Sequence, residues 1–265
     1  MQHVGCPYSI CTYQIKKHKM KKHFPNTLTC CNLISGCIAT YMAFQNHFEL
    51  AFMFIIIGAV FDFFDGFAAR LLHVSSNIGK ELDSLADDIT FGFAPSAIVF
   101  ALLKQTLTTN ATACNIEACP VAEYLPYIAF VMAAFSALRL AKFNLDERQS
   151  TTFIGLPTPA NALFWASLCV SLQQSITAEN SLWISICFIV GTLVSCWLLV
   201  CEIPMFALKF KNFSIKDNVI RYGFILMSIL LLIILGWAGF SAIIVLYVLT
   251  SIANNLIGTK IAKEE

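Results

Sequence analysis

Long apolar segments follow one another through this chain, and they restrict its fold more than any other feature of the sequence. From residue 27 onward, runs of about 20 residues with few charges recur almost without a break. A helix of that length crosses a bilayer core of about 30 Å and satisfies its backbone hydrogen bonds internally. Charged residues make up only 12% of the chain, and the mean hydropathy is +0.72. The sequence therefore predicts an integral membrane protein with no separate soluble domain.

The apolar runs predict eight membrane spans. They cover residues 27–45, 49–72, 81–103, 124–145, 157–176, 181–203, 219–238 and 239–257. The predicted fold class is all-α: a polytopic membrane helix bundle with a six-helix core and two further C-terminal transmembrane helices.

These spans divide the chain into four predicted parts. Residues 1–26 form a basic N-terminal segment whose first 14 residues are expected to be disordered, and residues 27–203 form the six-helix core. Residues 204–218 form a loop, and residues 219–265 form a transmembrane hairpin with a short tail.

Basic residues gather on one side of the predicted membrane. Every Lys and Arg except Lys104 lies in the terminal segments, in the loops 73–80, 146–156 and 204–218, or at the span ends next to these loops. Because Lys and Arg are enriched in cytoplasmic loops, both termini and these three loops are predicted to face the cytoplasm.

Four carboxylates interrupt the second and third spans. Asp62 and Asp65 are three residues apart, and Asp83 and Asp87 are four apart, so each pair shares one face of a helix. A charge inside a bilayer costs at least about 2.5–3.5 kcal/mol, and four neighbouring carboxylates repel each other unless cations neutralise them. Hard divalent cations with oxygen ligands, such as Mg²⁺, Mn²⁺ or Ca²⁺, suit this set, and four acids could hold two of them.

Small residues and one cation accompany the carboxylates. Gly66 and Gly79 would let a nucleotide or diphosphate approach the backbone closely. Arg70 offers a planar cation that suits phosphate. Each feature alone also fits helix packing or an anchor at the membrane interface.

The full spacing resembles the signature of the CDP-alcohol phosphotransferase family. The matching positions run from Asp62 to Asp87: Asp62, Asp65, Gly66, Ala69, Arg70, Gly79, Asp83 and Asp87. The resemblance implies a six-helix catalytic core and transfer of a phosphoryl-alcohol group from a CDP-linked lipid to a hydroxyl, with release of CMP. It implies Asp62, Asp65, Asp83 and Asp87 as ligands of Mg²⁺ or Mn²⁺, two ions in all, with Asp87 also the general base.

The same resemblance implies that Gly66, Ala69, Arg70 and Gly79 bind the CDP-lipid. Asp88 has no place in the signature, and it is expected to lie behind the site or on the surface.

Further segments are similar to the phosphatidylserine synthases of that family. These are PNTLTCCNLISG (25–36), RLAKFN (139–144), FIGLPTPANA (153–162) and IPMFALK (203–209). They imply CDP-diacylglycerol and L-serine as substrates. Arg139, Lys142 and Asn144 suit the serine carboxylate, although Arg139 and Lys142 could equally anchor the helix at the membrane surface.

Other functions stay open at this point. Another acceptor within the family would make the chain a phosphatidylglycerophosphate or phosphatidylinositol-phosphate synthase, and intramembrane carboxylates also occur in cation transporters. Membrane lipids are its expected surroundings, no nucleic acid is expected as a partner, and a homodimer is one open option. Cys114 and Cys119 could form a disulfide in an oxidising compartment.

Overall fold

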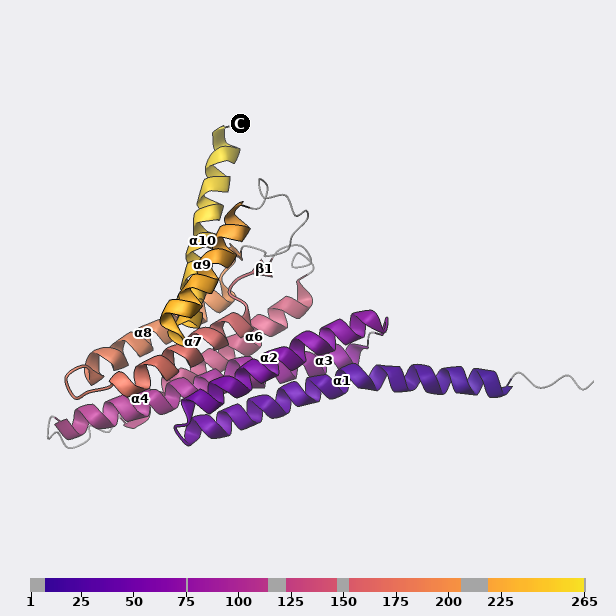
Figure 1. Cartoon of the computed structure of the whole chain (residues 1–265), viewed down its shortest axis with the longest axis horizontal. Helices are drawn as coiled ribbons and strands as arrows, with labels where there is room; N and C mark the ends of the chain where they lie inside the picture. Colours follow the sequence, from indigo (N-terminus) through magenta and orange to yellow (C-terminus); the bar gives the residue numbers. More distant parts are fainter. Residues whose placement is uncertain (1–7, 75, 114–122, 147–152, 206–218, 265) are drawn as a thin grey trace, which may run out of the picture.

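The computed structural model describes residues 8–74, 76–113, 123–146, 153–205 and 219–264. Helices dominate these ranges, as Figure 1 shows. The first part of the chain forms α1 (Tyr8–Phe44), α2 (Phe48–Leu71), α3 (Asn77–Asp87), the π-helix η1 (Asp88–Phe93) and α4 (Ala94–Ala113). It is followed by the 3₁₀ helix η2 (Leu125–Phe130), α6 (Val131–Leu145), α7 (Thr158–Leu172), the 3₁₀ turn η4 (Gln173–Ser175), α8 (Ser181–Val200), α9 (Val219–Leu235) and α10 (Ala238–Glu264).

The all-α membrane bundle is confirmed. Within the described ranges, six helical segments are long and apolar enough to cross a membrane: 23–44, 48–71, 77–111, 125–145, 181–200 and 238–255. The predicted spans 157–176 and 219–238 correspond to the shorter helices α7 and α9, of 15 and 17 residues. The six candidates therefore include α10 and omit α7, so they are not the same six helices as the predicted core.

The N-terminal helix starts earlier than the sequence suggested. α1 begins at Tyr8, inside the 14 residues expected to be disordered, while residues 1–7 lie outside the described part. No Gly or Pro occurs between Tyr8 and Phe24. Extending an existing helix costs much less than starting one, so this basic segment can continue as part of α1, which also contains Pro25.

Three helices meet very closely at one place beside the core. A Cβ added at Gly36 of α1 would lie 2.7 Å from the Cα of Thr90, and one at Gly58 of α2 would lie 2.5 Å from the Thr90 methyl group. Thr90 also donates a hydrogen bond of 3.0 Å to the backbone carbonyl of Asn32. Glycine at both positions thus allows η1 to press against α1 and α2, and this contact fixes the start of η1 relative to the first two helices.

The chain turns sharply between α2 and α3 before it re-enters the bundle. His73 has a positive φ of 50°, and Ser76 caps α3 by accepting a hydrogen bond of 3.0 Å from the backbone N–H of Gly79. α2 and α6 end, and α3 and α7 begin, at this end of the bundle, which we call the site end. Helix α3 continues into η1, where the wider π-helix replaces the uniform helix that we predicted for 81–103.

A short backbone pairing closes the site end on another side. β1 (Phe153–Ile154) pairs antiparallel with β2 (Pro204–Met205), a two-stranded element that the all-α prediction did not include. Gly155 follows with a positive φ of 74°, and a Cβ there would lie 2.8 Å from the carbonyl oxygen of Leu199. The tight approach therefore joins the start of α7 to the end of α8. Pro157 is the N-cap of α7.

The C-terminal hairpin packs on the bundle rather than standing apart. Figure 1 shows α9 and α10 side by side, rising steeply from the other helices. Phe240 and Trp237 meet Phe52 edge-to-face, with ring centroids 5.4 and 5.5 Å apart, and Ser241 donates to the carbonyl of Phe164 over 3.1 Å. These contacts attach α10 to α2 and α7.

Candidate active site

Three carboxylates converge near the site end of the bundle. One oxygen each of Asp62 on α2, and Asp83 and Asp87 on α3, lie within 4.8 Å of one another, and all three side chains are half-buried. Three of the predicted residues, from two helices, thus lie close together in the structure.

Asp65, the fourth predicted member, takes a different position. Its carboxylate is buried, and its Oδ2 accepts a hydrogen bond of 2.5 Å from Thr29 of α1. It does not belong to the group of three, although it lines the same pocket as Asp83. The fourth carboxylate is held toward α1 because a hydroxyl on that helix faces it.

A second residue of α1 holds Asp87. The side-chain amide of Asn32 donates a hydrogen bond of 3.0 Å to Asp87 Oδ1, and Asn32 itself is fully buried. Thr90 donates a hydrogen bond to the backbone carbonyl of Asn32. The close contact of α1, α2 and η1 therefore also sets the position of this amide. The orientation of Asp87 is thus determined by a neighbouring helix.

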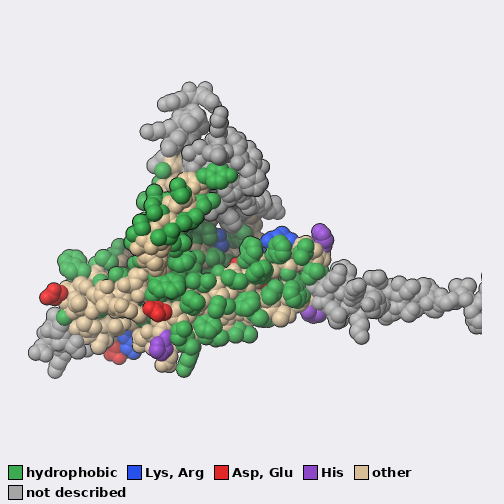
Figure 2. Space-filling view, viewed as in Figure 1, with side chains coloured by type: hydrophobic (Ala, Val, Ile, Leu, Met, Phe, Trp, Pro, Cys, Tyr) green, Lys and Arg blue, Asp and Glu red, His purple; other side chains and the backbone are tan. Residues whose placement is uncertain are grey.

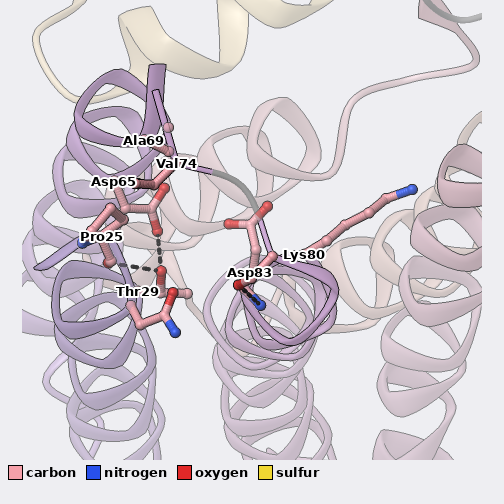
Figure 3. Close-up of a pocket in the computed structure, with 11 residues that line it drawn as sticks. Pro25, Thr29, Asp65, Ala69, Val74, Lys80 and Asp83 are labelled. Carbon is pink, nitrogen blue, oxygen red and sulfur yellow. Dashed lines mark hydrogen bonds between the residues drawn. The ribbon is translucent and has the colours of Figure 1, made fainter. Parts of the chain in front are cut away.

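A pocket opens beside the carboxylates between α1, α2 and α3. We call it the carboxylate pocket. Its volume is about 250 Å³, and it is lined by Pro25, Asn26, Thr29, Asp65, Gly66, Ala69, Val74, Ser76, Gly79, Lys80 and Asp83. Figure 3 shows Asp65 and Asp83 reaching into the space between their helices from opposite sides, while the Lys80 side chain extends away from it.

The predicted CDP-lipid residues lie at this pocket. Gly66, Ala69 and Gly79 line it directly. A Cβ at Gly79 would come within 3.1 Å of Asn26 Oδ1, so glycine keeps space beside that amide. Arg70 is exposed at the end of α2, and its guanidinium lies 3.5 Å from the place that a Cβ of Gly66 would occupy.

A second pocket lies between α6, β1 and the end of α8, and we call it the Arg139 pocket. It has a volume of about 400 Å³. The lining residues are Arg139, Lys142, Leu145, Asp146, Ile154, Leu199, Val200, Cys201 and Glu202. It shares no lining residue with the carboxylate pocket.

The three candidate serine residues separate in the structure. Arg139 and Lys142 line the Arg139 pocket. Asn144 does not; its amide donates to Ser84 Oγ over 2.7 Å, and its carbonyl accepts from Lys80 over 3.0 Å. Asn144 therefore ties α6 to α3, because its place near the end of α6 faces that helix.

Arg139 is a buried cation in the wall of the second pocket. Its side chain is only 7% exposed, and its guanidinium lies 5.1 Å from the centre of the Phe143 ring. Its Nε has no hydrogen-bond partner in the described ranges. A buried guanidinium nitrogen without a partner is costly, so this group is well suited to receive a ligand.

Asp88 lies apart from the three carboxylates. One of its oxygens is 2.6 Å from the place that a Cβ of Gly92 would take, and Ser136 Oγ is 3.0 Å from the same point. Its buried Oδ1 has no hydrogen-bond partner among the residues that the structure describes. It faces the contact between η1 and α6 and is half-buried.

The donor set fits a divalent metal ion. The three converging groups are carboxylates, which hard cations prefer, and nothing in the described part of the chain donates a hydrogen bond to the buried Asp83 Oδ1. Three carboxylates so close together need positive charge to offset their repulsion, and Arg139 alone does not supply enough.

Sequence reasoning missed the contribution of α1. Asn26, Thr29 and Asn32 recur every three residues, so they share one face of that helix and supply polar groups to the pocket, Asp65 and Asp87. Polar residues at helical spacing in an apolar span were the available signal. Cys114 and Cys119 lie outside the described residues, so the structure does not address their pairing.

Comparison with known proteins identifies relatives of the chain. The profile of the CDP-alcohol phosphatidyltransferase family matches residues 22–197. A Bacillus subtilis protein named CDP-diacylglycerol–serine O-phosphatidyltransferase is 34% identical over 148 residues, which cover 56% of this chain and 73% of that protein.

Two further relatives carry the same name. The one from Helicobacter pylori strain 26695 is 32% identical over 153 residues, or 57% of this chain and 58% of its own length. The one from Saccharomyces cerevisiae is 31% identical over 174 residues, or 60% of this chain and 57% of its own. The chain thus matches less than two thirds of these two proteins.

Proposed function

The chain belongs to the CDP-alcohol phosphatidyltransferase family, and we propose that it transfers the phosphatidyl group of CDP-diacylglycerol to the hydroxyl of L-serine. The products are phosphatidylserine and CMP. The observation that carries this proposal is the convergence of Asp62, Asp83 and Asp87 beside a pocket lined by Gly66, Ala69 and Gly79. The shared name of the three relatives supports serine as the acceptor.

The carboxylates would hold two divalent cations, Mg²⁺ or Mn²⁺, through Asp62, Asp65, Asp83 and Asp87. When bound, such ions neutralise a diphosphate and stabilise the charge that develops on the leaving CMP. Thr29 orients Asp65, and Asn32 orients Asp87, so two of the four ligands are positioned by α1.

The donor occupies the carboxylate pocket in this proposal. Gly66, Ala69 and Gly79 leave room for the cytidine diphosphate part, and Arg70 supplies positive charge at its edge. The acyl chains of the donor then extend into the bilayer along α2, whose side chains Phe63, Phe64 and Phe67 are exposed.

The acceptor approaches from the other side. Arg139 receives the serine carboxylate and Lys142 adds positive charge nearer the mouth of the pocket, since both line the Arg139 pocket. Asn144, which was predicted to join them, instead supports the position of α6 through Ser84. Asp87 accepts the proton of the serine hydroxyl, whose oxygen then forms a bond to phosphorus as the bond from phosphorus to CMP breaks.

The site end faces the cytoplasm in this proposal, because Lys104 is the one basic residue that the sequence predicts on the opposite side. That orientation gives the soluble substrate serine access to the Arg139 pocket and lets CMP leave into the same compartment.

The test is a comparison of acceptors. Purified protein receives CDP-diacylglycerol in detergent micelles with Mn²⁺ or Mg²⁺ and one labelled acceptor at a time: serine, glycerol 3-phosphate, inositol phosphate or ethanolamine. We expect serine to give CMP and a labelled lipid, and EDTA to abolish both until a divalent cation is restored. If glycerol 3-phosphate or inositol phosphate alone gives CMP, the chain has another acceptor within its family. Full activity in EDTA would reject the metal centre.

A further inference from the structure

The Arg139 pocket contains charges of both signs. Two basic side chains, Arg139 and Lys142, and two acidic ones, Asp146 and Glu202, line it, so its formal charge is zero. The carboxylate pocket differs, because its charged lining residues are Asp65, Asp83 and Lys80. A charge-balanced pocket suits a ligand that carries no net charge but has both a negative and a positive group.

Backbone hydrogen bonds hold the segment that carries Glu202. Glu202 lies between the end of α8 and β2. The backbone of this segment accepts hydrogen bonds at Ile203 from Gly155, over 2.9 Å, and at Pro204 from the Asn255 amide of α10, over 2.6 Å. The backbone that carries Glu202 is therefore fixed at the end of α8, and the exposed Glu202 side chain lines the pocket from there.

The basic side of the pocket carries a donor without a partner. Arg139 is buried and lacks a hydrogen-bond partner at Nε within the described ranges, whereas Lys142 is exposed. A molecule that enters past Glu202 and Lys142 thus meets a buried guanidinium that can donate to a carboxylate.

We propose that the Arg139 pocket is the entrance for the acceptor, and that Glu202 makes it selective for a zwitterionic alcohol over a phosphorylated one. This inference rests on the proposed function. Two cations without acidic neighbours would attract a phosphate dianion more strongly than serine. Glu202 repels that dianion and offsets one of the two positive charges. For a zwitterion, repulsion of its carboxylate by Glu202 is balanced by attraction of its ammonium group.

The experiment measures serine KM and inhibition by glycerol 3-phosphate in the full-length protein, with CMP release as the readout. The variants are Glu202→Gln and Glu202→Lys. The matched control is Glu179→Lys, the same charge reversal at an exposed residue in the turn before α8, at the opposite end of that helix. All are measured at low and at high salt.

For Glu202→Lys we expect the inhibition constant of glycerol 3-phosphate to fall about tenfold at low salt, with a smaller change for Glu202→Gln. The change should shrink at high salt, because screening acts on charges and not on packing. Serine KM should change little, and Glu179→Lys should behave as the unchanged protein.

An inhibition constant that stays the same in both Glu202 variants, while serine still yields CMP, would overturn this inference and leave the proposed function standing. Absence of CMP release from serine by the unchanged protein would instead reject the proposed function. If Glu202→Lys does not fold, the Gln variant and its salt dependence decide the question.

Discussion

At the scale of single residues, the site depends on polar side chains that restrain the carboxylates. Asp87 receives the Asn32 amide over 3.0 Å, and Asp65 receives the Thr29 hydroxyl over 2.5 Å. A side chain with one fixed partner has fewer orientations to lose when substrate binds, so it is prepared for its role before the substrate arrives. This arrangement separates the roles of adjacent acids, because Asp88 has no such contact with α1 in the described structure and faces Gly92 and Ser136 instead.

Replacing Asp87 by Asn should slow the reaction without removing donor binding. The variant keeps three of the four carboxylates, and general-base assistance is worth about 10²- to 10⁴-fold, so kcat should fall by roughly that factor. We would measure kcat and the affinity for CDP-diacylglycerol. The control is Asp88→Asn, the same change one residue further, which should retain most activity. A normal kcat for Asp87→Asn would remove the base assignment.

At the scale of elements, helix contacts bring the site residues together. Gly36 and Gly58 admit Thr90, and this contact sets where the chain passes from α3 into η1, next to Asp87. The wider turn of a π-helix at this point changes the direction of the following side chains relative to a regular helix. The geometry of the acids thus depends on two glycines that carry no chemistry.

Gly36→Ala should therefore lower both stability and activity. Its Cβ would lie 2.7 Å from the Thr90 Cα and 2.9 Å from its backbone nitrogen, so backbone must move. Overpacking of this kind costs about 1–3 kcal/mol. Thermal unfolding in detergent and CMP release would be followed together. Gly223→Ala is the control, because nothing lies within 4 Å of its added Cβ; an equal loss in both variants would contradict the role of the three-helix contact.

At the scale of the whole molecule, the outer surface is apolar and the polar groups are inside or at the ends. Figure 2 shows hydrophobic side chains over most of the visible face of the described helices, with few charges among them. Large exposed apolar residues include Phe63, Trp183, Trp197, Leu226 and Ile233. Buried polar residues such as Asn32, Ser136 and Asn161 lie in the interior. This distribution is the one that a lipid solvent requires.

Topology can be checked by labelling introduced cysteines with an impermeant maleimide in intact cells and in inverted vesicles. Ser76→Cys, at the start of α3, should react from the cytoplasmic side, and Asn110→Cys, near the end of α4, from the other side. The unsubstituted chain, which has 11 cysteines, supplies the background signal. A reversed pattern would separate the site from cytoplasmic serine and contradict the proposed orientation.

Local spacing was enough to predict the helices and the carboxylates. Length and apolarity identify a membrane helix because the bilayer leaves the backbone no other partner, and i, i+3 or i, i+4 spacing places Asp62, Asp83 and Asp87 on inward faces. The spacing of fixed residues within 62–87 is specific enough to indicate the family by itself. These features depend on residues that are near one another in the chain.

Contacts between distant residues could be decided only by the tertiary structure. Thr29 donates a hydrogen bond to Asp65 across 36 positions, and Asn32 reaches Asp87 across 55. Glu202 joins Arg139 in one pocket because Gly155 lets β1 approach the end of α8, and Asn144 turns to Ser84 because α6 packs on α3. The physical reason is the same in each case: a side chain's partner is set by which helices pack together, and the periodicity of one helix carries no information about its neighbour.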